Sequence, residues 1–524
     1  MKILFINPNI DTGGYKPLAI SVLTAIAKKE GHEISVFDTS FVNVSKYSSN
    51  EEHTETQTAG EEVLNFVPVD LAGHNIVEED IDLEKSFVKK LQEFSPDMIA
   101  LTIFSNEYGL GVTLLQIAKK YNSNIITLTG GVHCIADPQG VIKNDCVDFV
   151  CRGEGEELFK KLLKKINQNE KNYTDIPGLW WKEAGEVKNN SIGLYTNMED
   201  LPFMNYDDFD DRLFIRAMNG KVYRSADVSL TRGCFEKCSY CLFDKMYEIS
   251  EGGNRIRKPS VKRSIEELQY LIKRHNLNFI RFQDSTFLSV GYKFLKEYAK
   301  EYKDKIGLPF VIDSTPQNVT YDKIKCLKEM NCLSISVGLE TGNEKMRLTQ
   351  LNKKATNEKI IHAFHTINSF NIRTVSFILL GFPFETRENI FETIDLIRKC
   401  EVAAPNVGFV YPFKGTKLRD NSIKSGAFDP SIEVMGVPQY SRDRPVIKNK
   451  NITGDEYAGL YRTFMFYCKF PRSYFPDIAI AEQLTDEGNL MYQRLKNEYA
   501  NNKLYNTTLD VRLNARSSNQ HASL

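Results

Sequence analysis

The chain has 524 residues, of which 42% are apolar and 26% are charged. At roughly 150 residues per domain, this length predicts about three domains, each with enough apolar residues to bury a core. The 67 basic and 68 acidic side chains leave a net charge of −1, so the chain has no overall field that would hold a polyanion. We therefore expect no nucleic-acid partner.

Residues 1–8 contain one lysine and an apolar run that is too short for a secretory signal. No apolar run in the sequence approaches the roughly 18 residues that cross a bilayer. These features predict a cytoplasmic protein without a membrane span. In that compartment the ten cysteines are expected to be thiols, metal ligands or reactive groups and not disulfides.

Residues 1–165 alternate β-rich runs with longer amphipathic segments, which predicts an α/β domain with a doubly wound, Rossmann-like parallel sheet. The expected strands are residues 2–6, 33–37, 98–103, 124–128 and 147–151, and the expected helices are near 17–30, 79–94, 109–121 and 154–166. The polar stretch 43–62 is predicted to be a surface insertion. Residues 166–220 show no clear periodicity and are interpreted as a linker segment.

Residues 221–430 show a second alternation of strands and helices, which predicts a partial (β/α)6 TIM-like barrel with its chemistry at the C-terminal ends of the strands. The expected strands are residues 227–231, 279–282, 309–313, 333–339, 374–380 and 406–411. Residues 431–524 are expected to be a mainly helical C-terminal region, with helices at 455–466 and 478–499 and a disordered tail. The helices around 461–475 are expected to cover the mouth of the barrel.

Three closely spaced cysteines give the strongest chemical signal. Cys234, Cys238 and Cys241 directly follow the first barrel strand, where barrel enzymes keep their active sites. Thiolates at offsets of four and three can wrap one iron–sulfur cluster. The pattern favours a 4Fe-4S cluster with three protein ligands and one open iron, a state suited to binding and reducing a ligand.

Two structural alternatives stand beside this interpretation. The same offsets place three cysteines on one face of a helix, as small buried side chains, although Gly233 and the polar residues within the run oppose a plain core helix. A structural zinc site is the other alternative, and it would need a fourth ligand at short spacing, whereas the next His or Cys after Cys241 is His275.

The run Cys234-x3-Cys238-x2-Cys241, with Tyr240 just before the last cysteine, resembles the motif of the radical S-adenosylmethionine (SAM) superfamily. The resemblance implies that the open iron binds the amino and carboxylate groups of SAM, with Tyr240 beside the cofactor. It also implies that an electron from the cluster splits the sulfonium bond to give methionine and a 5′-deoxyadenosyl radical. Such a cluster belongs at the negative end of the potentials open to iron–sulfur centres.

Later segments resemble the SAM-binding segments of that superfamily, in the expected order along the chain. Asp284, which ends the second strand, corresponds to a residue near the SAM amino group, with a cap of the next turn as the alternative. The resemblance implies that Glu340 binds the ribose or amine of SAM and that Gly381 lets the backbone approach adenine. Arg373 faces either the SAM carboxylate or solvent. Residues 411–416 match the loop after strand six.

The first domain resembles the cobalamin-binding domain that precedes many radical SAM domains. The resemblance rests on Asn-Pro-Asn at residues 7–9, Gly-Gly-Val-His at 130–133 and Arg-Gly-Glu-Gly-Glu at 152–156. Glycines directly after parallel strands let a large flat ligand approach the backbone at the switch point of the sheet. The residues that the resemblance places at the cobalamin are Pro8, Gly130, Gly131, His133, Gly153 and Glu154.

Many cobalamin proteins carry the motif Asp-x-His-x-x-Gly, whose histidine becomes the lower cobalt ligand. This sequence lacks that motif. His133 follows a different strand, and His32 lies in a turn between a helix and a strand, so both are interpreted as structural or close to the ligand. The resemblance then implies a cobalt with no histidine below it and with its dimethylbenzimidazole tail detached.

Together these features predict a cobalamin-dependent radical SAM enzyme that cleaves SAM at a 4Fe-4S cluster. It would transfer a methyl group from methylcobalamin to an unactivated carbon or phosphinate of a small-molecule substrate. The expected electron donor is an external protein of the flavodoxin or ferredoxin type. One alternative is oxidation, ring formation or rearrangement without methyl transfer, and a second is a non-catalytic cobalamin or redox sensor.

Overall fold

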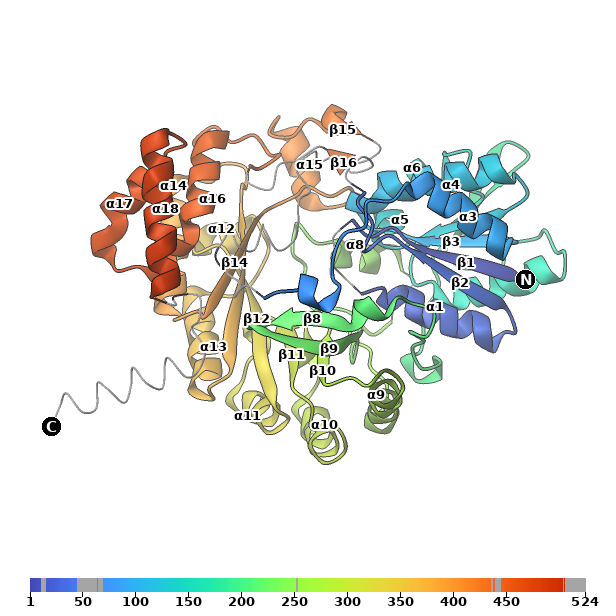
Figure 1. The fold of residues 1–524 in the computed structure, drawn as a ribbon, viewed down its shortest axis with the longest axis horizontal. Helices are drawn as coiled ribbons and strands as arrows, with labels where there is room; N and C mark the ends of the chain where they lie inside the picture. Colours follow the sequence, from blue (N-terminus) through green and yellow to red (C-terminus); the bar gives the residue numbers. More distant parts are fainter. Residues whose placement is uncertain are drawn as a thin grey trace.

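A computed structural model describes residues 1–10, 16–44, 64, 69–250, 253–434, 437–438, 444–502 and 504. These residues form two seven-stranded sheets and a C-terminal group of helices (Figure 1). The first sheet and its helices lie on the right in that view, the second sheet in the centre, and the C-terminal helices on the left. The two expected α/β architectures are confirmed. The predicted insertion at 43–62 and the polar tail fall almost entirely outside the described residues.

The first sheet has five parallel strands in the order β2-β1-β3-β4-β5. They are β1 (Lys2–Asn7), β2 (Glu33–Asp38), β3 (Met98–Thr102), β4 (Ile126–Gly130) and β5 (Phe149–Cys151). Helices α1 (Leu18–Lys29) and α7 (Glu156–Asn167) pack on each other, as do α3 (Leu83–Phe94) and α4 (Tyr108–Tyr121). The strand order reverses between β1 and β3, which is where doubly wound sheets open a crevice for ligands.

The segment predicted to be a linker contributes two strands to this sheet. β6 (Leu179–Glu183) pairs antiparallel with β5, and β7 (Glu186–Asn189) pairs with β6. The turn between them has positive φ at Ala184 (49°) and Gly185 (83°). Two-residue hairpins of this kind usually carry Asn or Asp before Gly. Because Ala184 stands at this position, the sequence carries no clear signal of the turn.

The second sheet keeps its strands in sequence order, from β8 to β14. They are β8 (Ile215–Met218), β9 (Lys221–Val228), β10 (Phe279–Phe282), β11 (Phe310–Ser314), β12 (Cys332–Glu340), β13 (Arg373–Leu380) and β14 (Ala404–Phe409). The six strands β9 to β14 are parallel, as predicted, and β8 adds an antiparallel edge through an Asn219-Gly220 turn.

Helices alternate with these strands to complete the partial barrel. They are α8 (Leu242–Ile249), α9 (Val261–His275), α10 (Tyr292–Lys305), α11 (Tyr321–Glu329), α12 (Glu344–Thr349), α13 (Asn357–Ser369), α14 (Arg387–Lys399) and α15 (Lys417–Lys424). Side chains at the starts of several helices, including Ser260, Thr356 and Thr386, accept hydrogen bonds from the backbone amide three residues further along the chain. These caps satisfy N–H groups that a helix start leaves unpaired.

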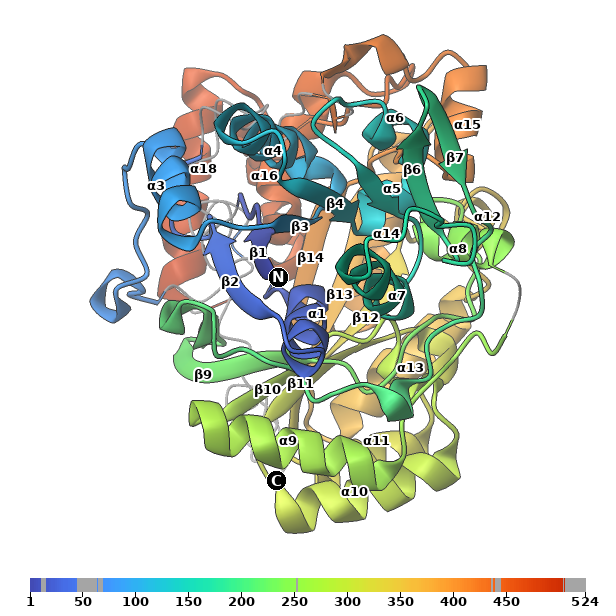
Figure 2. The ribbon, with the colours of Figure 1, turned by 90° about the vertical axis from the view of Figure 1, so that its right-hand side faces the viewer.

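The C-terminal helices are α16 (Gly454–Lys469), α17 (Phe475–Ala481) and α18 (Asp486–Asn501). The helix predicted at 478–499 is therefore two helices, because Thr485 caps a new one. α16 packs against α14 and β14, and the expected cover of the barrel mouth by residues 461–475 stays a prediction. Figure 2 shows the first sheet stacked above strands β9 to β11. Among the described residues, no helix is long and apolar enough to cross a membrane.

Glu385 ties the loop after β13 to α16. Its Oε2 accepts hydrogen bonds from the Gly381 amide (2.8 Å) and from the Tyr457 hydroxyl (2.9 Å), whereas its Oε1 is buried without a partner. Burial raises the pKa of Glu385 to about 7, against 4.5 in its usual state. Ionising this carboxyl therefore costs stability in the folded protein and not in the unfolded chain.

We predict that Glu385→Gln raises the thermal midpoint relative to the wild type as the pH rises. The raised pKa means that the stabilising contribution of the neutral carboxyl is complete below about pH 4.5 and is lost as the pH approaches 7. Melting curves are measured between about pH 5 and 8. The difference in the free energy of unfolding between the variant and the wild type should widen by up to about 3 kcal/mol over this range. Glu388→Gln, on an exposed neighbour, is the control, and a gap that does not change with pH would contradict the prediction.

Candidate functional site

The cysteine loop connects β9 to α8 at the C-terminal edge of the barrel. Cys234 and Cys238 are buried, Cys241 is partly exposed, and Cys241 is the residue directly before α8. Gly233 has a φ of 106°, and a Cβ at this position would lie 1.7 Å from the Arg255 carbonyl oxygen. Only glycine fits here, so the path of the chain into the first cysteine is fixed.

The residues directly after α12 hold the middle of this loop through hydrogen bonds. The Ser239 amide donates to the Leu351 carbonyl (2.9 Å), and its hydroxyl donates to the Gln350 carbonyl (2.7 Å). The Asn352 side chain donates to the Lys237 carbonyl (2.8 Å). The loop is therefore braced by the segment that follows β12, and the cysteines sit in a preformed frame.

The three thiols have the chemistry of cluster ligands. Burial raises the pKa of all three, to about 12 for Cys238 and about 11 for Cys241, so binding an iron–sulfur cluster is what would make them thiolates. No three His, Cys, Asp or Glu side chains in the described part of the chain converge on a single metal ion. A 4Fe-4S cluster does not require that, because each thiolate binds a different iron.

Asp284 fixes the start of the same loop. Its carboxylate accepts hydrogen bonds from the Leu230 amide (3.2 Å) and from both the amide and the hydroxyl of Thr231. The side chain is 2% exposed, and burial raises its pKa to about 7. Both carboxylate oxygens are thus taken up by the loop. The direct contact between Asp284 and SAM stays a prediction.

The first of two cavities lies at the barrel mouth and has a volume of about 560 Å3. We call it the barrel cavity. It brings together two of the predicted SAM contacts, Tyr240 and Glu340, with side chains from β13 and β14. Its lining residues are Asn106, Tyr240, Glu340, Phe377, Leu379, Phe409, Val410, Tyr411, Phe413, Arg444 and Val446. Asn106 comes from the first domain, and Arg444 and Val446 come from the C-terminal region.

Glu340 is held in an unusual backbone state at the end of β12. Its φ is 67°, and the pairing of β12 with β13 shifts register between Gly338 and Glu340. Lys353 Nζ lies 2.6 Å from Glu340 Oε1, and both side chains are buried. Burial opposes the charge on Lys353, but the Glu340 carboxylate and the Cys238 sulfur outweigh it and raise the pKa of Lys353. This lysine places a positive charge beside the cysteine loop.

Other side chains of the protein pack closely against Gly381. A Cβ on Gly381 would lie 2.6 Å from Pro445 Cβ and 3.1 Å from Phe409 Cδ1. The space that the missing side chain leaves is therefore filled by the segment that carries Arg444 and Val446. An approach of adenine to this glycine stays a prediction. The close contact with Pro445 is a second reason why this position favours glycine.

The second cavity lies between the two sheets and has a volume of about 350 Å3. We call it the interdomain cavity. Strand ends of the first sheet line one side, and the start of the cysteine loop lines the other. The predicted cobalamin contacts among its lining residues are Gly130, Gly131, Gly153 and Glu154. Much of the rest is apolar, including Leu18, Leu23, Leu128, Ile135, Phe159, Phe243 and Met246.

Two predicted cobalamin contacts are not among the residues that line this cavity, namely Pro8 and His133. His133 is 1% exposed, its Nδ1 lies 3.0 Å from the Ser105 hydroxyl, and its ring stacks on Tyr108 at 4.3 Å. Burial lowers its pKa to about 4, so the ring is neutral. These contacts describe a packed core histidine, which agrees with the structural interpretation of this residue.

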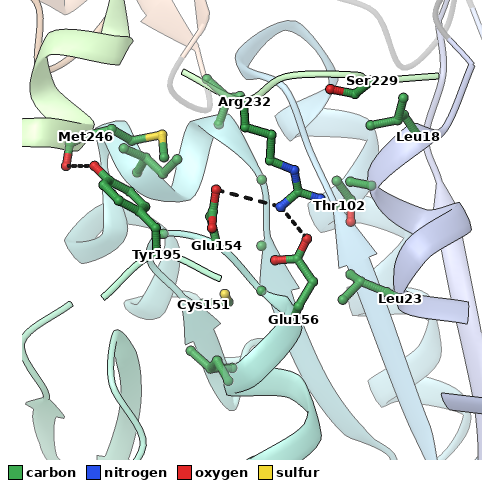
Figure 3. A pocket seen from close by; sticks show the side chains of 18 of the residues that line it. Leu18, Leu23, Thr102, Cys151, Glu154, Glu156, Tyr195, Ser229, Arg232 and Met246 are labelled. Atoms are coloured by element: carbon green, nitrogen blue, oxygen red, sulfur yellow. Dashed lines mark hydrogen bonds and ion pairs between the residues drawn. The ribbon is translucent and has the colours of Figure 1, made fainter. Parts of the chain in front are cut away.

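Four largely buried charges line the interdomain cavity where it borders the cysteine loop. We call Glu154, Glu156, Arg232 and Arg257 the charge quartet. Arg232 Nη1 lies 2.6 Å from Glu156 Oε1 and 3.7 Å from Glu154 Oε1, and Arg257 Nη2 lies 2.5 Å from Glu154 Oε1. Figure 3 shows the Arg232 side chain reaching toward both carboxylates from the cysteine loop.

The sequence matches the radical SAM superfamily over residues 228–397 and the B12 binding domain over residues 67–163. These ranges contain the cysteine loop and the glycine-rich strand ends of the two cavities. The chain therefore carries a radical SAM domain and a B12-binding domain, as its motifs predicted. The corresponding cofactors are a 4Fe-4S cluster and SAM for one domain and cobalamin for the other.

Several curated proteins resemble the chain over most of its length. An uncharacterized methyltransferase of Pyrococcus horikoshii is 27% identical over 73% of this chain and 80% of its own length. The anaerobic magnesium-protoporphyrin IX monomethyl ester cyclase of Rubrivivax gelatinosus is 22% identical over 86% of this chain and 74% of its own. The cytidylyl-2-hydroxyethylphosphonate methyltransferase of Streptomyces wedmorensis is 21% identical, with coverages of 82% and 83%.

Two solved structures share the fold. The radical SAM methyltransferase TsrM from Kitasatospora setae, with cobalamin and a [4Fe-4S] cluster bound, has a TM-score of 0.60 and 15% identity, covering 81% of this chain and 78% of its own. The cobalamin-dependent SAM radical enzyme OxsB, with aqua-cobalamin and SAM bound, has a TM-score of 0.64 and 14% identity, covering 95% and 71%. At these identities the likeness concerns the fold.

Sequence reasoning missed four charged residues at the site. Lys353 and Arg257 lie in segments without a motif, so nothing in the sequence distinguished them from surface charges. Arg232 and Glu156 stand inside segments that the motifs did single out, but their pairing joins two domains. Such pairing depends on how the sheets meet, which local pattern does not reveal.

We predict that Lys353→Gln weakens the binding of SAM by roughly tenfold or more, because it leaves the buried Glu340 carboxylate without its partner. Calorimetric titration of SAM into the reconstituted protein measures this. Lys354→Gln changes the exposed neighbour and should bind SAM like the wild type. Equal affinities for the two variants would show that the Lys353–Glu340 pair does not support the cofactor.

Proposed function

We propose that the protein is a cobalamin-dependent radical SAM methyltransferase that acts on an unactivated carbon or phosphinate of a small molecule. One observation carries the proposal: a single loop borders both cavities. Thr231, Arg232 and Gly233 line the interdomain cavity, and Tyr240, on the same loop, lines the barrel cavity. Cofactors in the two cavities would therefore lie on either side of the cluster ligands.

For transfer to a carbon, the chemistry that the bound cofactors supply balances as follows. Two molecules of SAM and two electrons convert a C–H bond of the substrate to a C–CH3 bond, and they leave methionine, 5′-deoxyadenosine and S-adenosylhomocysteine. One SAM would supply the 5′-deoxyadenosyl group that takes the hydrogen from the substrate. The other SAM would supply the methyl group by way of cobalamin. The electrons come from an external one-electron donor, which we propose to be of the flavodoxin or ferredoxin type.

The chain's own residues supply binding, orientation and exclusion of water. Cys234, Cys238 and Cys241 hold the cluster at the border of the two cavities. Glu340, fixed by Lys353, offers a carboxylate to the SAM ribose or amine in the barrel cavity. The apolar walls of both cavities keep water away from reactive species.

The interdomain cavity also supports the proposed state of the cobalt. Among the described residues that line it there is no histidine. These residues would therefore offer a bound cobalamin no histidine ligand, and the detached dimethylbenzimidazole tail stays a prediction. We further propose that the partners are small molecules and the electron donor, without nucleic acid, and that the protein works in the cytoplasm.

A second candidate function is ring formation or oxidation without methyl transfer. The relative that favours it is the anaerobic cyclase of Rubrivivax gelatinosus, whose similarity covers 86% of this chain, more than either methyltransferase relative does. Both functions use the same cofactors and the same two cavities. They differ in the fate of the methyl group of SAM.

We predict that SAM labelled in its methyl group transfers the label to cobalamin bound by the protein. The protein is reconstituted without oxygen with iron, sulfide and hydroxocobalamin, and given a strong reductant and labelled SAM. Label in the corrinoid fraction, together with S-adenosylhomocysteine, is the expected result. Bound corrinoid that takes up no label while 5′-deoxyadenosine forms would instead favour the second candidate.

We also predict that Cys234→Ala, Cys238→Ala and Cys241→Ala each abolish the release of 5′-deoxyadenosine and lower the iron content from about four per chain. Each thiolate holds one iron, and losing one exposes a second corner of the cluster. Cys326→Ala, on α11, removes a buried thiol outside the loop and should keep both iron and activity. Full activity in any of the three loop variants would refute the cluster assignment.

A further inference from the structure

The charge quartet is the feature of the site that the proposed chemistry leaves unexplained. Its four side chains are between 9% and 19% exposed, and two cations face two anions. Removing charges from water costs more than most buried ion pairs return, so such a group is a poor source of stability. Well-packed apolar residues would join two domains at lower cost. The quartet therefore calls for an explanation in terms of geometry.

The backbone forces the two arginines of the quartet together. The Arg232 amide donates to the Arg257 carbonyl (2.9 Å), and the Arg257 amide donates to the Arg232 carbonyl (3.0 Å). This isolated antiparallel bridge sets two like charges side by side. Glu154, in the loop between β5 and α7, and Glu156, the first residue of α7, reach across and neutralise them. The pairing thus requires the first domain to be in place.

The two ion pairs of the quartet differ in how firmly they are held. Arg257 makes a two-pronged contact with Glu154, and it also donates to the Thr196 carbonyl (2.9 Å) and stacks over the Tyr195 ring. Glu154 in turn accepts from the Thr196 amide (2.9 Å). This pair belongs to a fixed frame around the interdomain cavity. The pair of Arg232 with Glu156 is the link from that frame to the cysteine loop.

Arg232 lies directly before Gly233 and Cys234, and this stretch has no slack. The Gly233 Cα is packed against the Arg255 carbonyl, and the Thr231 amide is bonded to Asp284. The Arg232 side chain and Cys234 are thus two residues apart on one tightly held stretch of backbone. Glu156 is the first residue of α7 and lines the interdomain cavity. The link joins the residues that hold one cofactor to the residues that hold the other.

We propose that Arg232, acting through Glu156, is a positioning residue that sets the separation between the iron–sulfur cluster and the corrin. The inference rests on the proposed function only in that both cofactors are bound. SAM held at the cluster must bring its methyl group to the cobalt. In that step cob(I)alamin gives an electron pair to the methyl carbon, the carbon–sulfur bond breaks, and S-adenosylhomocysteine leaves. A misplacement of about 1 Å lowers such a rate by up to roughly 100-fold.

The test compares four variants of the full chain, reconstituted with cluster and cobalamin. Arg232→Gln and Glu156→Gln each remove one charge of the link. Arg232→Lys keeps the charge, and since Arg232 reaches both carboxylates through one nitrogen, the single ammonium of lysine matches its role. Lys28→Gln is the control, because Lys28 forms an ion pair with Asp208 (2.6 Å) that is not part of either cavity.

Two measurements are made on each variant. One is the magnetic interaction between reduced cluster and cob(II)alamin, seen by electron paramagnetic resonance as broadening and faster relaxation of the cobalt signal. It depends steeply on the distance between the two centres and needs no substrate. The other is the rate at which SAM methylates cob(I)alamin on the protein, set against the rate of 5′-deoxyadenosine release.

We expect Arg232→Gln and Glu156→Gln to bind iron and cobalamin, to change the magnetic interaction, and to methylate cobalamin roughly 10- to 100-fold more slowly, a larger loss than that of 5′-deoxyadenosine release. Arg232→Lys should restore most of both readouts. If Arg232→Gln fails to fold, Glu156→Gln and Arg232→Lys decide the matter.

The inference is overturned if the magnetic interaction and the methylation rate of the Glu156→Gln or Arg232→Gln protein equal those of Lys28→Gln. Failure of the proposed function looks different. In that case the wild type binds both cofactors and never methylates cobalamin, while the magnetic comparison among the variants still decides whether Arg232 sets the distance.

Discussion

The arrangement of the molecule depends on one constraint, which is that a short loop carrying three thiols must be held rigid between two sheets. Each part of the loop is fixed by a different element. Asp284 holds its start, Gly233 packs against the Arg255 carbonyl, and the residues after α12 bond to its middle. A loop without such anchors would pay a large entropic cost to order its ligands when the cluster binds. Here that ordering is built into the fold.

The secondary structure was largely predictable because it depends on local patterns. The parallel strands of both sheets lie within a few residues of their predicted positions, since each follows a β-rich run next to an amphipathic helix. The antiparallel edges were not predicted. β6 and β7 turn through Ala184, which carries no turn signal, and β8 is four residues long. Edge strands of this kind can be identified only from their pairing with neighbouring strands in the folded sheet.

The functional site, like the fold, was only partly predictable from the sequence. Motifs located the cysteines, Glu340 and the glycines at the strand ends, because spacing and residue type alone encode them. Motifs did not reveal what each side chain contacts. Asp284 accepts hydrogen bonds from the cysteine loop, and His133 packs in the core of the first domain. The quartet and the Lys353–Glu340 pair join residues far apart in the sequence, so only the assembled fold brings them together.

One wall of the barrel cavity comes from outside the barrel. Arg444 and Val446 reach it because Pro445 fits against Gly381, and the short segment around them precedes α16. The residues that would hold the cluster and this wall of the adjoining cavity are thus encoded in separate stretches of the gene. Substitutions in the short segment can reshape the cavity while the cysteine loop and its supports remain intact, which would give such a scaffold a simple route to different substrates.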